Sequence, residues 1–267
     1  MADAPRQRVL ITGSTKGIGR GLAAEFARRG HAVFVTGRAQ GDVDEVVAGL
    51  DGEIRGAPCE VTRIGEVQDL WDQAARAWGG LDIWINNAGL ARTTRPILDY
   101  DQGDVETMVT SNMIGTINGS RVAARGFLEL GGGRLFNMLG GGSNGEYFPG
   151  MGVYGTTKRG LRYFSDALAK ELKDTPVLVG QIRPGMIVTE GVVREAKDDL
   201  ASFEKSRAMM NRLVDQVETV APFLVDRILA TEKTGERIAW MTPTKIMKRM
   251  LLGRFQQRED QFERFGL

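Results

Sequence analysis

Short, largely apolar runs alternate with amphipathic stretches along the chain as far as residue 182. The apolar runs predict strands at residues 9–12, 31–36, 53–61, 81–85, 134–138 and 177–182. Between them, apolar residues recur at helical spacing in residues 18–29, 42–50, 64–78, 105–130 and 154–173. Apolar strands that alternate with helices indicate a parallel sheet covered on both faces. The pattern therefore predicts a Rossmann-type, doubly wound α/β fold.

The alternation changes after Pro184. Residues 192–229 have a helical pattern, residues 237–241 predict a final strand, and a basic, aromatic tail follows. Because no linker or internal repeat interrupts the chain, we expect a single domain over residues 1–267. Within it we expect a substrate-covering segment at about residues 184–235 and a C-terminal extension at about residues 243–267.

The composition is that of a globular protein with a sizeable core, since 42% of the residues are hydrophobic and 26% are charged. A net charge of +1 removes any global electrostatic argument for nucleic acid or an anionic membrane as the main partner. With one cysteine, Cys59, and one histidine, His31, no metal site is expected. No run approaches a membrane span and the N-terminus lacks a signal-peptide pattern, so we expect a cytoplasmic location.

A glycine-rich turn joins the first predicted strand to the first predicted helix. It reads Thr12-Gly13-Ser14-Thr15-Lys16-Gly17-Ile18-Gly19. Glycine lets backbone amides approach a pyrophosphate, and a helix N-terminus supplies unpaired N–H groups and a positive dipole end. Its spacing differs from the G-x-G-x-x-G dinucleotide fingerprint, and alone such a turn can be merely a tight connection.

Further motifs follow in order, and together they resemble the short-chain dehydrogenase/reductase family. They are the T-G-x-x-x-G-x-G turn, Asn86-Asn87-Ala88-Gly89, Asn112, Tyr154-x-x-x-Lys158 and Pro184-Gly185. The resemblance implies an oxidoreductase that moves a hydride between a nicotinamide cofactor and a small-molecule carbonyl or alcohol. It also implies a homodimer or homotetramer that pairs the helices predicted at residues 105–130 and 154–173.

Tyr154 and Lys158 are four residues apart, so on a helix they share one face. A neighbouring ammonium and the helix N-terminus would stabilise the phenolate and lower the pKa of Tyr154 from its usual value near 10. Such a phenol can donate a proton to a carbonyl oxygen or accept one in reverse. The resemblance also gives Lys158 the nicotinamide ribose and gives Asn112 the task of orienting Lys158. A buried tyrosine beside a snorkelling lysine is the structural alternative.

Cofactor preference can be inferred at the end of the second predicted strand, Thr36-Gly37-Arg38. NAD-preferring enzymes carry an acidic residue there, whereas Arg38 and Lys16 suit a ribose 2′-phosphate. The pair predicts NADP, although either could be a solvated surface charge. The resemblance adds cofactor contacts at Gly13, Ser14, Thr15, Gly17, Ile18, Gly19, Glu60, Val61, Asn87, Ala88, Gly89, Tyr154, Lys158, Pro184, Gly185, Ile187 and Thr189. Glu60 stands where the family usually has aspartate.

The family's catalytic serine is missing, because Gly140 holds its usual place in Asn137-Met138-Leu139-Gly140-Gly141-Gly142-Ser143. This loop, the run from Pro184 to Thr189 and the C-terminal region to about residue 255 resemble the chlorophyll b reductase-like subgroup. That resemblance implies a carbonyl on a large, mostly apolar ring system, such as a formyl-bearing tetrapyrrole. Bulky ketones, steroids and fatty carbonyls fit the sequence equally. We expect Ser143 to hold the substrate oxygen, unless it is simply a polar turn residue.

Two other functions are compatible with the sequence. The missing serine suggests a catalytically impaired NADP(H)-binding sensor or scaffold, which retention of Tyr154, Lys158 and Asn112 opposes. An RNA or membrane-surface binder would use the basic run at residues 245–254 with Phe255, Phe262 and Phe265.

Overall fold

The computed structural model describes residues 5–253 and 258–267. Arg254 and Phe255, from the basic run and the aromatic tail, lie outside these residues. One parallel sheet has the strand order β3-β2-β1-β4-β5-β6-β9. Its strands are β1 Arg8–Ile11, β2 Ala32–Gly37, β3 Ile54–Pro58, β4 Ile83–Asn86, β5 Gly133–Met138, β6 Val177–Arg183 and β9 Arg237–Ala239.

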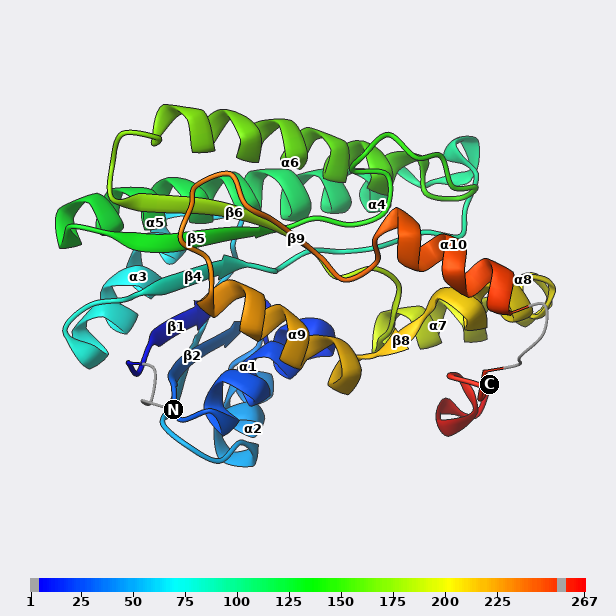
Figure 1. Ribbon diagram of the computed structural model, residues 1–267, viewed down its shortest axis with the longest axis horizontal. Coiled ribbons are helices and arrows are strands. Elements are labelled where there is room, and N and C mark those ends of the chain that lie inside the picture. The colour runs from blue at the N-terminus through cyan, green and yellow to red at the C-terminus, as the bar shows by residue number, and fades with distance from the viewer. Residues whose placement is uncertain (1–4, 254–257) are drawn as a thin grey trace.

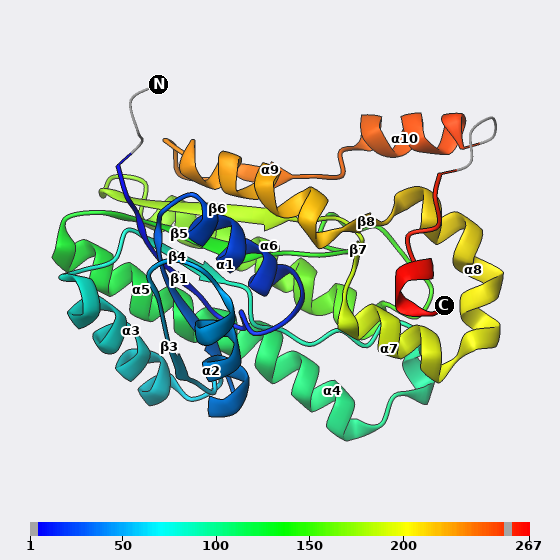
Figure 2. The same ribbon diagram turned by 90° about the horizontal axis from the view of Figure 1, so that it is seen from below.

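Helices cover both faces of this sheet (Figures 1 and 2). One face carries α1 (Gly17–Arg28), α2 (Gln40–Gly49) and α9 (Val217–Leu229), and the other carries α3 (Ile64–Trp78), α5 (Thr116–Leu130) and α6 (Gly152–Glu171). An apolar cluster fills each interface, with Phe26 and Leu224 on the first side and Trp71 and Phe127 on the second. The predicted doubly wound, single-domain fold is confirmed.

The helix predicted over residues 105–130 has a more complex structure. It runs without interruption through α4 (Gln102–Val109), the π-helical turn η2 (Thr110–Gly115) and α5. A π-helical turn adds one residue to the local hydrogen-bonded ring and is often found at functional sites. Asn112 lies inside this turn and is fully buried. Hydrophobic periodicity does not show such a local change, because it measures the average spacing.

The region predicted as helical over residues 192–229 is divided. It contains α7 (Glu190–Asp198), α8 (Leu200–Leu213) and α9, and the short strand β8 (Asp215–Gln216) separates α8 from α9. β8 pairs in parallel with β7 (Ile187–Val188). Two-residue strands carry no periodicity, which is why the pattern missed them. The remaining elements are η1 (Ile97–Asp99), α10 (Pro243–Leu252) and η3 (Glu263–Phe265).

The C-terminal tail packs against α7 and α8 at one end of the molecule (Figure 2). Phe262 is fully buried and lies edge-on to Phe203, with 5.0 Å between ring centroids. Phe262 is therefore unavailable as a surface anchor, contrary to the proposed RNA or membrane binder, because it fills this small core. No helix in residues 5–253 or 258–267 is long and apolar enough to cross a membrane.

Asp215 fastens α10 and the tail to β8. Its carboxylate is 3% exposed and accepts hydrogen bonds from Arg249 at 2.8 Å, Arg258 at 2.9 Å and the Trp240 indole at 2.6 Å. Burial would raise the pKa of Asp215, but these partners outweigh it and hold the pKa below its usual value.

We expect Asp215→Asn to destabilise the folded protein by about 3 kcal/mol at pH 7, because two arginines lose their buried counter-charge. A carboxyl with a depressed folded-state pKa stabilises above its unfolded pKa, and the effect disappears as pH falls through the folded value. Urea unfolding of the wild type and variant should therefore converge toward pH 3. Asp174→Asn, at an exposed acid, is the control. Equal stability at pH 7 would contradict the assignment.

Candidate active site

The glycine-rich turn is held against the end of β4 by a set of hydrogen bonds. The Thr12 hydroxyl accepts from the N–H groups of Asn87 and Ala88, each at 3.0 Å. The Asn87 amide in turn donates to the carbonyls of Thr12 at 2.9 Å and Gly13 at 2.8 Å. Gly13 has φ +61°, and a Cβ there would lie 2.7 Å from the Cα of Ala88. Only glycine lets the turn and β4 approach this closely.

Ser14, one of the expected cofactor contacts, has its hydroxyl and N–H engaged within the fold. Its buried hydroxyl donates to the Ile11 carbonyl at 2.7 Å and accepts from the Thr36 N–H at 2.9 Å. Its own N–H donates to the Thr36 carbonyl at 2.8 Å. Ser14 therefore shapes the turn, while Thr15 packs beside Gly37 at the end of β2.

Two cations lie at the carboxyl ends of β1 and β2. Lys16 Nζ is 3.2 Å from Asp42 Oδ2, and both side chains are exposed. Such an exposed ion pair contributes little free energy, so Lys16 can exchange this partner for another anion. Arg38 is also exposed and forms no ion pair or hydrogen bond with the described residues. Glu60 is engaged by Thr62, whose N–H and hydroxyl donate to its carboxylate at 3.1 and 3.0 Å. Val61 packs against Gly115 of η2.

Tyr154 and Lys158 project from the first turns of α6, beside the end of β5. A Cβ built at Gly140 would overlap the Tyr154 hydroxyl oxygen, so that hydroxyl lies directly against the backbone. Lys158 is 5% exposed, and its ammonium donates to the Met138 carbonyl at 3.0 Å. Lys158 Nζ lies 5.6 Å from the centroid of the Tyr154 ring.

The expected lowering of the Tyr154 pKa is wrong for this structure. Burial raises the pKa of Tyr154 to about 12, and burial lowers the pKa of Lys158 to about 8. Desolvation penalises each charged form, and the ammonium is bonded to a carbonyl instead of the phenol. Tyr154 is therefore protonated at neutral pH, which is the state that donates a proton.

Asn112 is bonded to the segment that follows β4. Its side-chain oxygen accepts from the Leu90 N–H at 2.7 Å, and its amide donates to the Leu90 carbonyl at 2.9 Å and the Thr157 hydroxyl at 3.0 Å. A Cβ at Gly89 would lie 2.9 Å from Asn112 Oδ1 and 3.7 Å from Lys158 Nζ. Three separate motifs of the sequence thus meet beside Lys158.

The loop after β5 contains donors without protein acceptors. Ser143 is fully buried, and its hydroxyl has no hydrogen-bond partner among the described residues. Its N–H donates to the Gly140 carbonyl at 3.3 Å, and its carbonyl accepts from Arg159 at 3.2 Å. Within the described part of the chain, the N–H groups of Gly140, Gly141 and Gly142 also have no acceptor. The loop can therefore offer either a hydroxyl or backbone amides.

The segment after β6 reaches back over the glycine turn. Gly185 has φ +83°, and Ile187 packs into the core below it. The Thr189 hydroxyl caps α7 by accepting from the Val192 N–H at 3.5 Å. The next residue, Glu190, accepts the Gly17 N–H at 3.0 Å. Sequence reasoning missed Thr12, Thr157 and Glu190, and a contact such as that of Glu190, which spans 173 positions, leaves no local signal.

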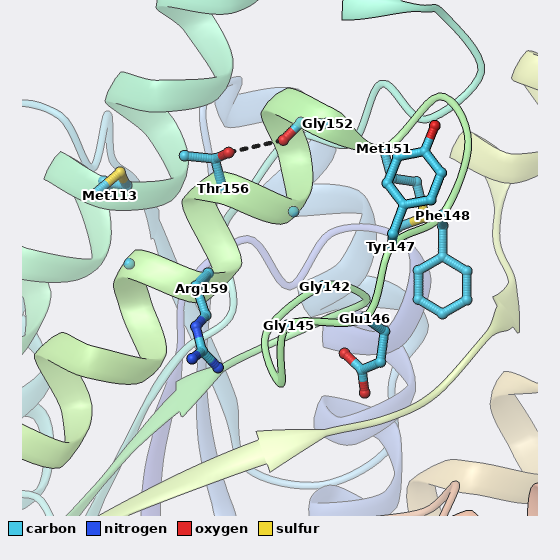
Figure 3. Close-up of a pocket in the computed structure, with 12 residues that line it drawn as sticks. Met113, Gly142, Gly145, Glu146, Tyr147, Phe148, Met151, Gly152, Thr156 and Arg159 are labelled. Atoms are coloured by element: carbon cyan, nitrogen blue, oxygen red, sulfur yellow. Dashed lines mark hydrogen bonds between the residues drawn. The ribbon is translucent and has the colours of Figure 1, made fainter.

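A pocket of about 500 Å³ lies on the other side of α6 (Figure 3). Gly152, Thr156 and Arg159 line its helical wall, opposite the loop that carries Phe148. With 100° of rotation per helical residue, Gly152, Thr156 and Arg159 face away from Tyr154 and Lys158, which are not part of the pocket lining.

The described residues contain no group of three or more histidine, cysteine or acidic side chains that could hold a metal.

Residues 7–200 match the family described as short chain dehydrogenase. The chain belongs to this family. Family membership places it among oxidoreductases, and it explains why the glycine turn, Asn87, Asn112, Tyr154 and Lys158 converge at one end of the sheet.

Similar curated proteins include chlorophyll(ide) b reductases, as the subgroup resemblance predicted. The probable chlorophyll(ide) b reductase NYC1 of Arabidopsis thaliana is 34% identical over 90% of this chain and 52% of its own length. The chlorophyll(ide) b reductase NOL of the same plant is 34% identical over 93% of this chain and 75% of its own. The chain thus spans about half the length of NYC1. Sulfoacetaldehyde reductase 2 of Chromohalobacter salexigens is 34% identical over 73% of this chain and 78% of its own.

Solved structures share the fold. The closed form of serine dehydrogenase complexed with NADP+ has a TM-score of 0.77 and 29% identity, covering 88% of this chain and 95% of that one. A short chain dehydrogenase from Burkholderia cenocepacia in complex with NADP has a TM-score of 0.73 and 26% identity, covering 87% and 96%.

Proposed function

We propose that the protein is an NADP(H)-dependent oxidoreductase that moves a hydride between the nicotinamide and a carbonyl or alcohol. The observation that carries this proposal is the protonated Tyr154 hydroxyl against Gly140, with buried Lys158 beside it, at the sheet edge that also holds the glycine turn. The NADP-bound structures of serine dehydrogenase and the Burkholderia enzyme support the cofactor.

The residues present fit a dinucleotide phosphate. Gly13 and Gly17 have φ +61° and +56°, so the turn keeps a conformation without side chains in the way. The N-cap residue of α1, Lys16, makes no side-chain cap bond, and an anion is favoured at this helix N-terminus. Arg38 and Lys16 would bind the 2′-phosphate, and Asn87, Ala88 and Gly89 would line the path toward the nicotinamide.

When bound, NADPH would supply the hydride. Tyr154 donates its proton to the carbonyl oxygen as the alkoxide develops, and it accepts a proton in the reverse direction. Lys158, whose ammonium donates to the Met138 carbonyl, would bind the ribose, while Asn112 is bonded to both Leu90 and Thr157. Ser143, or the amides of the glycine loop, would polarise the substrate oxygen.

The substrate that we propose is a carbonyl on a bulky, mostly apolar molecule, such as a formyl-bearing tetrapyrrole. The identity with chlorophyll(ide) b reductases supports it. Residues 184–235 would cover this substrate, and the tail would brace them through Asp215. A panel of formyl tetrapyrroles, bulky ketones, steroids and fatty aldehydes, followed by loss of NADPH absorbance, tests the proposal.

A sensor or scaffold that binds NADP(H) without catalysis is the second candidate, because Gly140 occupies the place of the family serine. NADPH binding with no turnover across the panel would favour it.

We also propose a homo-oligomer through the outer face of α5 and α6, where Tyr163 is 79% exposed. The cytoplasmic location stays a prediction, which imaging of a tagged chain would test.

We expect Arg38→Asp to invert or erase a preference for NADPH over NADH, since the carboxylate would repel the 2′-phosphate and bond the ribose hydroxyls. Dissociation constants of both cofactors, measured by fluorescence titration, give the answer. Arg55→Asp, at another exposed arginine, is the control. Equal affinity of the wild type for both cofactors would refute the assignment.

We expect Tyr154→Phe to lose most turnover, by a factor of roughly 10² to 10⁴, because no other described group lies at the same place to transfer the proton. The dissociation constant for NADPH should stay within about twofold of the wild-type value, since Phe keeps the ring and its packing. Near-wild-type turnover of a confirmed substrate would mean that the acid/base is another residue.

We expect Ser143→Ala to lower kcat by on the order of a hundredfold with NADPH affinity intact, if its unpartnered hydroxyl bonds the developing alkoxide. Asn144→Ala, at the exposed neighbour, is the matched control. An unchanged kcat for Ser143→Ala would assign the role to the backbone amides of Gly140, Gly141 and Gly142.

A further inference from the structure

The N-terminus of α1 already carries a negative charge from another part of the chain. Glu190 Oε2 accepts the N–H of Gly17, the first residue of α1, at 3.0 Å. Lys16, at the N-cap position, makes no side-chain cap bond, so the Glu190 carboxylate takes the place of a cap. The carboxylate comes from the first residue of α7, in the segment that follows β7.

This carboxylate and a dinucleotide diphosphate need the same position. Free N–H groups and the positive dipole end make a helix N-terminus favourable for one anion, and a second anion beside the first is repelled. The contact is close, since a Cβ at Gly17 would lie 3.3 Å from the Thr189 methyl group and 3.7 Å from Glu190 Oε2. The residues at 189 and 190 therefore cover the face of the turn that a diphosphate would approach.

We propose that Glu190 competes internally with the diphosphate of the cofactor. Its carboxylate occupies the α1 N-terminus in the cofactor-free protein and leaves when the dinucleotide binds. This inference rests on the NADP binding proposed above and adds an affinity-determining residue to it. Only molecules in which Glu190 has been released can bind the cofactor. The apparent dissociation constant is therefore the intrinsic constant divided by the fraction of such molecules.

Release of Glu190 would affect the whole segment that covers the site. At its other end, α7 is held by Glu195, which accepts from the Thr93 N–H at 2.9 Å and the Thr93 hydroxyl at 2.5 Å. α7 thus rests on the loops after β1 and β4, and Ala196 packs in the small core with Phe203 and Phe262. In this proposal, cofactor binding at the glycine turn would release one of the contacts that hold α7.

The test compares wild type and Glu190→Gln by calorimetric titration with two ligands. NADPH carries the diphosphate, whereas 2′-AMP carries the 2′-phosphate and adenosine alone. We expect Glu190→Gln to bind NADPH more tightly, by roughly 3- to 30-fold, because the competing charge is gone. The affinity for 2′-AMP should change by less than about twofold. Glu45→Gln, an exposed acid on α2, removes the same charge elsewhere and should change neither.

Three results would overturn the proposal. Unchanged NADPH affinity would show that the carboxylate does not compete, and weaker affinity would show that it assists the cofactor. If Glu190→Gln bound 2′-AMP more tightly by the same factor as NADPH, or if Glu45→Gln bound NADPH equally tightly, the gain would be an effect of net charge alone. These titrations need no substrate, so they remain decisive if no compound of the carbonyl panel is turned over. Absence of NADPH binding in every variant would overturn both the inference and the proposed cofactor.

Discussion

α6, which carries Tyr154 and Lys158, is joined to the sheet by a network of buried polar side chains on β4, β5 and α5. The Trp84 indole donates to Asn86 at 2.7 Å, and the Asn86 amide donates to Ser120 and Asn137 at 3.0 and 2.9 Å. The Asn137 amide then donates to Ser165 of α6 at 2.9 Å. Each side chain of this network is hydrogen-bonded, and breaking one link would leave a buried polar group without its partner at a cost in free energy. The bond between Asn137 of β5 and Ser165 of α6 thus helps to position the helix that carries Tyr154 and Lys158.

Burial also decides the ionisation of the two catalytic candidates. It favours the neutral form of each, which raises the pKa of Tyr154 and lowers that of Lys158. Of the nearby charges, Arg183 lowers the Tyr154 pKa and Glu195 raises it, and both effects are smaller than burial. The protein alone therefore stabilises the protonated phenol of Tyr154.

The fold could be predicted because its signals are local. Strand hydrophobicity and helix spacing gave the parallel sheet, and the motif residues from Thr12 to Gly19 and from Tyr154 to Lys158 lie where their neighbours place them. The missed features are long-range. The engagement of Ser14 by β2 and the contact of Glu190 with α1 depend on partners distant in sequence. The predicted direction of the Tyr154 pKa shift was wrong because the sequence spacing shows a neighbouring lysine but does not show burial.

The missing serine is coupled to the position of Tyr154. Any side chain at Gly140 would overlap the Tyr154 hydroxyl, so restoring serine there would force the phenol to move. The absence of a side chain at Gly140 is thus what allows the Tyr154 hydroxyl to lie at its observed position. The same loop leaves the N–H groups of Gly140, Gly141 and Gly142 and the buried Ser143 hydroxyl without partners among the described residues. An unpaired buried donor costs free energy, so the Ser143 hydroxyl supports the proposal that this loop receives an acceptor from the substrate.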